Sequence, residues 1–214
     1  MKKVYLFLFI ATVSFCNVNA QNMNAICGED MVWYGLDFSN AKFVGQFTNI
    51  GDNSGSSGYE LRDKHIPAWN NLILNEPNKF NIRKSFRKSN VFNQLDVVNA
   101  RNSKIDVDKA VSFNTYKWDN DKATIEKIIS EYTGGEKKEG LGVVFIVESF
   151  DKMANLATIH VTLFDISTKK VLVTEEFVEV PVGVGVRNFW AGAIAKIFKT
   201  IDAQKINDWK SKCK

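Results

Sequence analysis

Two histidines are the only imidazoles that this chain offers for acid–base or metal chemistry. His160 stands between Thr158 and Thr162 in a stretch where polar and apolar residues alternate, which predicts a strand with these three side chains facing solvent. His65 lies near the start of a predicted helix, and no motif connects it with His160. A zinc site would need carboxylates from distant parts of the chain, so we expect no metal site and no cofactor.

Paired carboxylates occur at two places, and neither predicts a catalytic pair. Glu175 and Glu176 are neighbours in a predicted strand, so they point to opposite faces and cannot share a proton. Asp106 and Asp108 are better interpreted as part of a charged loop. Asp37 stands between two apolar residues of a strand, and we expect it to be buried and paired for structure. Because the G-x-S-x-G elbow of serine hydrolases is also absent, a hydrolase is the least favoured function.

Gly183 and Gly185 precede a predicted helix and form the first candidate binding site. Backbone N–H groups at such a helix start can hold an anion with the help of the helix dipole, and Arg187 and Asn188 would add side-chain contacts. The alternative is a plain connection from sheet to helix, because the third glycine of a dinucleotide-binding motif is absent. The glycine-rich stretch at 50–58 is interpreted as a surface loop, since no Lys-Ser or Lys-Thr pair closes it as in a P-loop.

A basic stretch at 80–89 forms the second candidate site. It interleaves four basic residues with apolar ones, and its two arginines are Arg83 and Arg87. One interpretation is an interaction patch for a partner. The other is a solvated helix face whose apolar side packs inward.

The first 20 residues have the pattern of a secretory signal peptide, with two lysines, an apolar run at 4–15 and small residues up to Ala20. Cleavage is predicted between Ala20 and Gln21. An unstructured lead-in at 21–30 and a single domain at 31–214 would then remain. The expected location is the periplasm or the outside of the cell.

Membranes and nucleic acids are not the expected partners. The apolar run is too short to span a membrane, and no later stretch is long enough. A lipid anchor at Cys16 is disfavoured, because Phe15 stands where lipoprotein signals need a small side chain. Loss of Lys2 and Lys3 with the signal peptide lowers the net charge from +4 to 4 − 2 = +2, which argues against nucleic-acid binding.

Two cysteines, Cys27 and Cys213, remain after the predicted cleavage. An even pair in an oxidising compartment predicts a disulfide. Such a bond would require the two ends of the mature chain to lie side by side. The alternative is two free thiols near frayed ends.

Hydrophobic periodicity predicts an α/β (α+β) fold with a single mixed sheet of about five strands. The expected order is β-α-β-α-β-β-β-α, with the helices mainly on one face and a carboxy-terminal amphipathic helix at about 188–206. The predicted strands lie at 31–38 with an extension at 41–44, at 95–98, and at 142–148, 156–164 and 171–178. The other predicted helices lie at 67–75 and 121–132, and the stretch 102–118 is interpreted as mostly irregular.

This order of elements resembles the amino-terminal domain of the Tol–Pal system's propeller protein and the penicillin-binding-protein activator lipoproteins. The segments 31–38, 141–147 and 158–167 and the helix from Asn188 provide the likeness. The chain also resembles uncharacterised secreted proteins of Gram-negative bacteria that share Val-Trp-Tyr-Gly-Leu-Asp-Phe and Arg-Asn-Phe-Trp-Ala-Gly segments. The resemblance implies a binding module of the cell envelope without catalysis.

The expected function is therefore that of an exported, non-catalytic module for binding or assembly in the cell envelope. Its partner would be an envelope protein or a second copy of the chain. The alternative is a protein that binds a small anionic ligand at 183–188.

Overall fold

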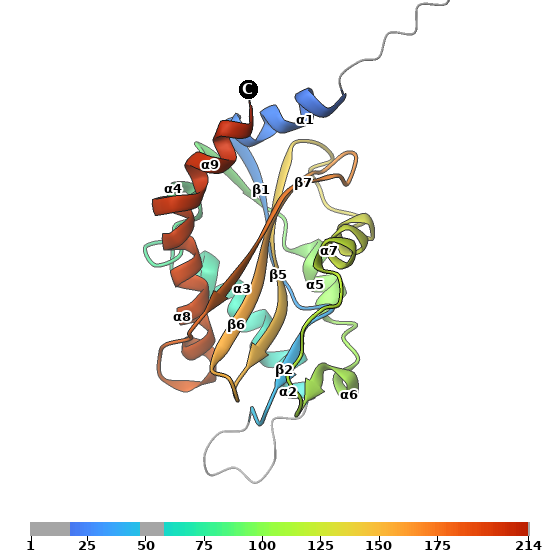
Figure 1. The fold of residues 1–214 in the computed structure, drawn as a ribbon, viewed down its shortest axis with the longest axis vertical. Helices are drawn as coiled ribbons and strands as arrows, with labels where there is room; N and C mark the ends of the chain where they lie inside the picture. Colours follow the sequence, from blue (N-terminus) through green and yellow to red (C-terminus); the bar gives the residue numbers. More distant parts are fainter. Residues whose placement is uncertain (1–17, 48–57, 214) are drawn as a thin grey trace, which may run out of the picture.

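The computed structural model describes residues 18–47 and 58–213 (Figure 1). Most of the predicted signal peptide, with Cys16, lies outside the described residues. So does the predicted surface loop at 50–58, except for Gly58, which begins a helix. Within the described part of the chain, no helix is both long enough and apolar enough to cross a membrane.

A mixed seven-stranded sheet forms the centre of the fold. Its amino-terminal strands run parallel to one another, and its last three strands form an antiparallel meander. The strands are β1 (Asp30–Asp37), β2 (Lys42–Val44), β3 (Asn90–Asn93), β4 (Val111–Ser112), β5 (Leu141–Asp151), β6 (Leu156–Asp165) and β7 (Val171–Glu179). The predicted fold class and the predicted meander are both confirmed.

β5 is the central strand because its residues are apolar on both faces. Every residue of β5 is buried. Val143 and Phe145 belong to the larger core on one face, and Val144 and Ile146 to a second core on the other. One edge of β5 pairs with β1 in its first half and with β2 in its second half, and the other edge pairs with β6.

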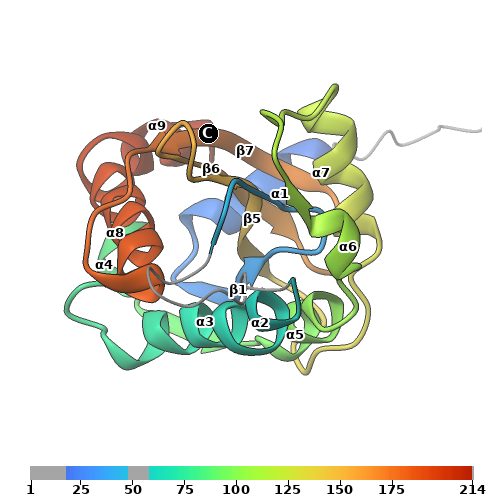
Figure 2. The same ribbon diagram turned by 90° about the horizontal axis from the view of Figure 1, so that it is seen from below.

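Helices cover both faces of this sheet, most of them on the side of the larger core. In Figure 1, α4, α8 and α9 lie on one side of the sheet, and α5 and α7 lie on the other. Figure 2 shows the same two groups from below. The helices are α1 (Val18–Cys27), α2 (Gly58–Glu60), α3 (Ile66–Asn75), α4 (Ile82–Phe86), α5 (Asp96–Asn102), α6 (Val107–Ala110), α7 (Asp121–Ser130), α8 (Gly185–Thr200) and α9 (Ile206–Lys210).

The last predicted helix is confirmed, although its geometry changes along its length. α8 passes through a π-helical turn at Ile201–Lys205 into α9. The predicted helix at 121–132 is also confirmed. Asn120 caps it by accepting a hydrogen bond from the backbone N–H of Ala123, and glycines follow its last turn.

Three local predictions need correction. The strand predicted at 95–98 is the start of α5, because Val97, Val98 and Asn102 share one buried helix face, and the strand β3 lies just before it. The stretch 41–44 is a separate strand, β2, because a turn between Phe38 and Ala41 breaks the chain away from β1. Within the stretch interpreted as irregular, α6 and β4 form short regular elements.

The unstructured lead-in predicted at 21–30 is wrong. α1 occupies its first part, and the predicted cleavage site between Ala20 and Gln21 lies within this helix. Ile26 is fully buried in the larger core, and β1 begins at Asp30. This packing orders a segment whose own sequence has little helical pattern.

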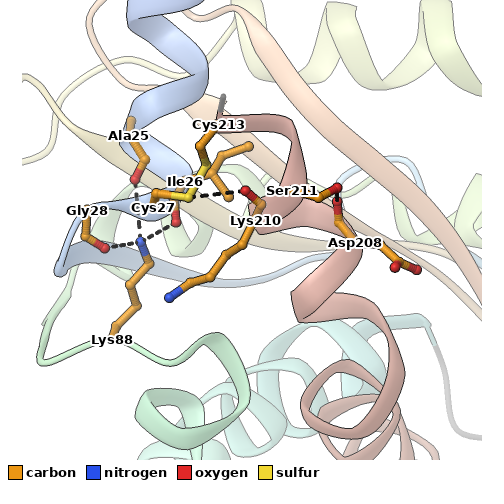
Figure 3. The surroundings of a disulfide bond; sticks show 9 residues. All are labelled: Ala25, Ile26, Cys27, Gly28, Lys88, Asp208, Lys210, Ser211 and Cys213. Carbon is orange, nitrogen blue, oxygen red and sulfur yellow. Dashed lines mark hydrogen bonds between the residues drawn. A yellow bond between two sulfur atoms is a disulfide. The ribbon is translucent and has the colours of Figure 1, made fainter.

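A disulfide joins Cys27 at the end of α1 to Cys213 in the last turn of the chain, as predicted (Figure 3). The two Cα atoms are 6.2 Å apart across a sequence separation of 186. Lys88 supports the same junction, since its Nζ donates to the carbonyl oxygens of Ile26 at 2.8 Å and Gly28 at 2.6 Å. The disulfide therefore binds the two ends of the domain together, and the buried lysine holds the amino-terminal end in place beside it.

The buried lysine predicts a pH-dependent stability. Burial, and then the charge of Lys210, lowers the pKa of Lys88 from 10.5 to about 8. At pH values between these two pKa values, the unfolded chain binds more protons than the folded one, so the free energy of unfolding should rise with pH. The rise is at most about 1.4 kcal/mol per pH unit, and less here because the carbonyl acceptors favour the charged form.

Urea denaturation of the wild type and of Lys88→Met between pH 7.5 and 10 tests this expectation. The stability difference between the two proteins should shift in favour of the wild type as the pH rises. A difference that stays constant over this range would show that the ammonium group of Lys88 is not destabilised in the folded protein.

Candidate functional site

The predicted anion site at 183–188 lies at the start of α8, where its residues are exposed together. Gly183 and Gly185 have positive φ values of 144° and 76°. The side chain of Arg187 donates from Nε to Oδ1 of Asn188 at 3.3 Å. No side chain caps the helix, and its first turn contains no acidic residue.

A series of exposed valines leads from the end of β7 into this segment, and we call it the valine strip. Its members stand at every second position and are exposed to large extents: Val178 50%, Val180 46%, Val182 51% and Val184 89%. Alternation at this spacing places side chains on one side of an extended chain, as at the end of β7, whereas a bend at Gly183 changes the direction of the chain before Val184. The signal was present in the sequence as Val-x-Val repeats, but alternation there could equally have indicated a buried face.

α8 holds the strip in place through its backbone. Nζ of Lys196 donates to the carbonyl oxygen of Val180 at 2.7 Å. One turn earlier on α8, Gly192 lies so close to the chain that a Cβ atom there would approach the carbonyl oxygen of Val182 to 2.0 Å. The carbonyl groups of Val180 and Val182 therefore face the helix. One methyl group of Val182 also lies against Gly192, and the side chain is half exposed.

β7 adds an open sheet edge to the strip. Among the described strands it pairs only with β6, while β6 pairs on both sides. Most residues of β7 are partly or fully exposed, whereas β6 is mostly buried. The backbone groups on the outer edge of β7 are thus available in the described part of the structure, directly before the valine strip.

The second candidate patch, Arg83 and Arg87, lies at the opposite end of the carboxy-terminal helix. Arg87 closes α4 in a left-handed conformation with φ 49°, and its Nη1 donates to Oδ1 of Asn207 at 2.6 Å. Arg83 donates to the carbonyl oxygen of Ser89. Asn207 is 22 residues from Gly185 along a nearly continuous helix, or roughly 30 Å. The structure does not bring the two candidate patches together.

Asp37 is buried and paired, as predicted. It is fully shielded from solvent and accepts hydrogen bonds from Oη of Tyr132 at 2.8 Å, Nε of Arg101 at 3.1 Å and the backbone N–H of Ser39 at 2.7 Å. Burial, and then the negative charge of Asp37, raises the pKa of Tyr132 well above its usual value. Arg101 also pairs with Glu131, so this network links β1, α5 and the end of α7.

A cavity of about 340 Å³ opens beside this network at the carboxyl end of β1. Ligands of open α/β sheets often bind at this end of the strands. Its described lining contains neither histidine and consists of Ser39, Asn40, Val97, Ala100, Arg101, Lys104, Glu131 and Thr133. The structure therefore does not join Asp37 to an imidazole, which the hydrolase hypothesis would require.

The prediction that His160 faces solvent is wrong. His160 is 2% exposed, and Thr162 is fully buried. The ring of Trp118 stacks on the imidazole, with centroids 5.0 Å apart and an angle of 10° between the planes. Polar alternation does not reveal this burial, because Trp118 ends a stretch without a regular pattern and its position over the sheet depends on tertiary packing.

Carboxylates surround the buried imidazole. Nε2 of His160 lies 2.8 Å from Oε2 of Glu148, and Oε1 of Glu148 accepts the backbone N–H of Trp118 at 2.9 Å. Asp121 and Glu176 complete a group whose possible ligand atoms all lie within 4.8 Å of one another. The sequence analysis identified none of these contacts, because the four residues come from four different elements.

Glu175 and His65 lie apart from the group around His160. Glu175 points to the opposite face from Glu176, as predicted, where it accepts Nε1 of Trp209 at 3.0 Å. His65 is mostly buried against Trp69 on the side of the larger core, and burial lowers its pKa. The two histidines are therefore on different faces of the sheet.

Two candidate sites thus remain. One is the exposed valine strip with the edge of β7, and the other is the group around His160. Comparison of the chain with protein-family models, with curated proteins and with solved structures finds no match.

Proposed function

We propose that this chain is an exported cell-envelope protein that binds another protein without catalysing a reaction. The partner docks on the valine strip and along the outer edge of β7. The valine strip is the observation on which this proposal rests. Four neighbouring apolar side chains exposed along one short segment are typical of an interaction site.

The chemistry of this surface favours a partner that presents an extended segment. An unpaired strand edge offers backbone donors and acceptors to an added strand, and pockets or rows of side chains at alternate positions then select its sequence. We therefore expect a partner segment with apolar residues at every second position. Because Lys196 and Gly192 already hold the valine strip in place, little conformational entropy is lost when it binds.

Export is part of the proposal and has two supports. The first 20 residues have the pattern of a signal peptide, and a disulfide between Cys27 and Cys213 is the kind of bond that persists in an oxidising compartment. The resemblance to envelope binding modules is in keeping with both. The partner is then an envelope protein or a second copy of this chain.

Site-specific photo-cross-linking in the producing cells tests the proposed surface. A photoreactive side chain at Val182 should yield a discrete cross-linked adduct, because the partner lies against this position. The same side chain at Phe113, which is 69% exposed and lies outside the strip, is the matched control and should yield none. Adducts from both positions, or from neither, would contradict the proposal, and the adduct mass distinguishes a second copy from another protein.

The alternative function is binding of a small anion at 183–188. It is favoured by the uncapped start of α8, which lacks acidic residues in its first turn, and by the exposed Arg187. A thermal-shift screen with phosphate, sulfate and carboxylates separates the two functions. An anion at a hundred times its dissociation constant should add about 2.7 kcal/mol of stability, and Arg187→Ala should reduce this gain.

A further inference from the structure

The group around His160, in which His160 and Glu148 are buried and Glu176 is exposed, is a second site that differs in chemistry from the valine strip. It contains one imidazole and three carboxylates, which come from β6, β5, β7 and the start of α7: His160, Glu148, Glu176 and Asp121. We propose that these four side chains bind a divalent transition-metal ion, with Zn²⁺ as the preferred ion.

The sheet itself aims three of the four side chains at one point. His160 and Glu176 are direct partners in the β6–β7 register. Glu148 is the extra residue of a bulge in β5, between Val147, which pairs with Ile159, and Ser149. A bulge redirects a side chain, and bulges are frequent beside functional sites. Here the bulge directs the Glu148 carboxylate toward the imidazole of His160.

Trp118 holds two of these groups in a fixed orientation. Its backbone N–H donates to one oxygen of Glu148, while its indole ring stacks on the imidazole of His160. Metal ligands in proteins are commonly oriented by such outer contacts, which reduce the cost of organising the site. The second oxygen of Glu148 and Nε2 of His160 remain directed at each other at 2.8 Å.

An unsatisfied oxygen is the independent observation that favours a cation here. Oδ1 of Asp121 is shielded from solvent and has no hydrogen-bond partner among the described residues. A buried acceptor without a partner is unfavourable. Lys117 pairs with the cluster through Glu176, with 3.6 Å between its Nζ and a carboxylate oxygen, and this pair does not satisfy Oδ1 of Asp121. A bound cation would satisfy Asp121.

The ligand set indicates which cation this would be. Imidazole suits Zn²⁺ and its transition-metal neighbours, whereas Mg²⁺ and Ca²⁺ prefer sites made of oxygen alone. Two ligand atoms that bind Zn²⁺ tetrahedrally, each about 2.1 Å from the ion, are about 3.4 Å apart. The ligand atoms of this group lie within 4.8 Å of one another, so the two most distant atoms must approach each other by up to about 1.4 Å. Asp121 and Glu176 are not fully buried and can make this movement.

Isothermal titration of the untagged, oxidised and chelator-treated protein with ZnCl₂ tests the proposal. The wild type should bind one Zn²⁺ per protein molecule. Asp121→Asn should weaken binding at least ten-fold, and His160→Gln should abolish it. Glu126→Gln, an exposed carboxylate on the same helix, is the matched control and should leave binding unchanged.

The outcome does not depend on the buried variant alone. Asp121 lies at a helix start, so Asp121→Asn should keep the far-ultraviolet circular dichroism of the wild type even if His160→Gln fails to fold. The proposal is overturned if the wild type binds no Zn²⁺ up to 1 mM. It is equally overturned if Asp121→Asn binds Zn²⁺ as tightly as the wild type, which would place the ion elsewhere.

Discussion

Replacing both Cys27 and Cys213 with alanine is expected to lower the free energy of unfolding by up to about 5 kcal/mol. The disulfide closes a loop across a sequence separation of 186, and for such a loop the chain-entropy relation predicts about this value. Residual structure in the unfolded chain usually reduces the effect toward 2 kcal/mol. The loss is large because the bond restricts nearly the whole domain and also secures α1 against the carboxy-terminal helix.

Urea denaturation of three proteins measures this effect: the oxidised wild type, the wild type reduced before unfolding, and the double variant. The reduced wild type and the double variant should have similar midpoints, both below that of the oxidised protein. Thiol titration of the oxidised protein should find neither Cys27 nor Cys213 as a free thiol. A difference in stability below about 1 kcal/mol would show that the bond contributes little to the fold.

Asp37→Ala is expected to cost about 3–5 kcal/mol, the range for breaking a buried ion pair. The substitution removes the acceptor of the buried hydroxyl of Tyr132 and one of the two carboxylate partners of Arg101. Glu131→Gln is a matched control, because Glu131 is the other, partly exposed partner of Arg101. An exposed pair typically contributes less than about 1 kcal/mol.

Chemical denaturation at pH 7 compares the two variants with the wild type. The account predicts a large loss for the variant at position 37 and a small one for the variant at position 131. Equal losses would contradict it, because they would show that burial of Asp37 does not distinguish the two pairs.

Much of the fold could be predicted because its signals are local. The meander from β5 to β7 follows from an apolar run and from alternation, and α7 follows from its cap and its apolar face. The disulfide follows from the count of cysteines in a chain whose first residues predict export. Each of these signals is read within a few residues, or from composition alone.

The errors arose where tertiary contacts decide the structure. α1 is ordered by Ile26 and the disulfide, and neither effect is visible in the helical pattern of 18–27. The polar alternation around His160 indicated a solvent face, yet Trp118 covers it. Alternation shows only that two faces differ, and a polar face can be buried when its groups satisfy one another.

The candidate sites show the same division. Residues 183–188 could be singled out from the sequence because they are contiguous. The support of the valine strip could not, because it depends on Gly192 and Lys196 lying one turn apart on a helix that packs against the strip. The group around His160 was missed for a similar reason, since its members are brought together only by strand register and by a bulge.

The most direct test of the proposed function is the affinity of the cross-linked partner, once purified, for charged variants of the strip. Val182→Asp combined with Val184→Asp should weaken binding at least ten-fold, because two carboxylates would have to be desolvated against an apolar surface. Phe113→Asp should bind like the wild type. Unchanged affinity in the double variant would contradict the claim that the valine strip is the docking surface.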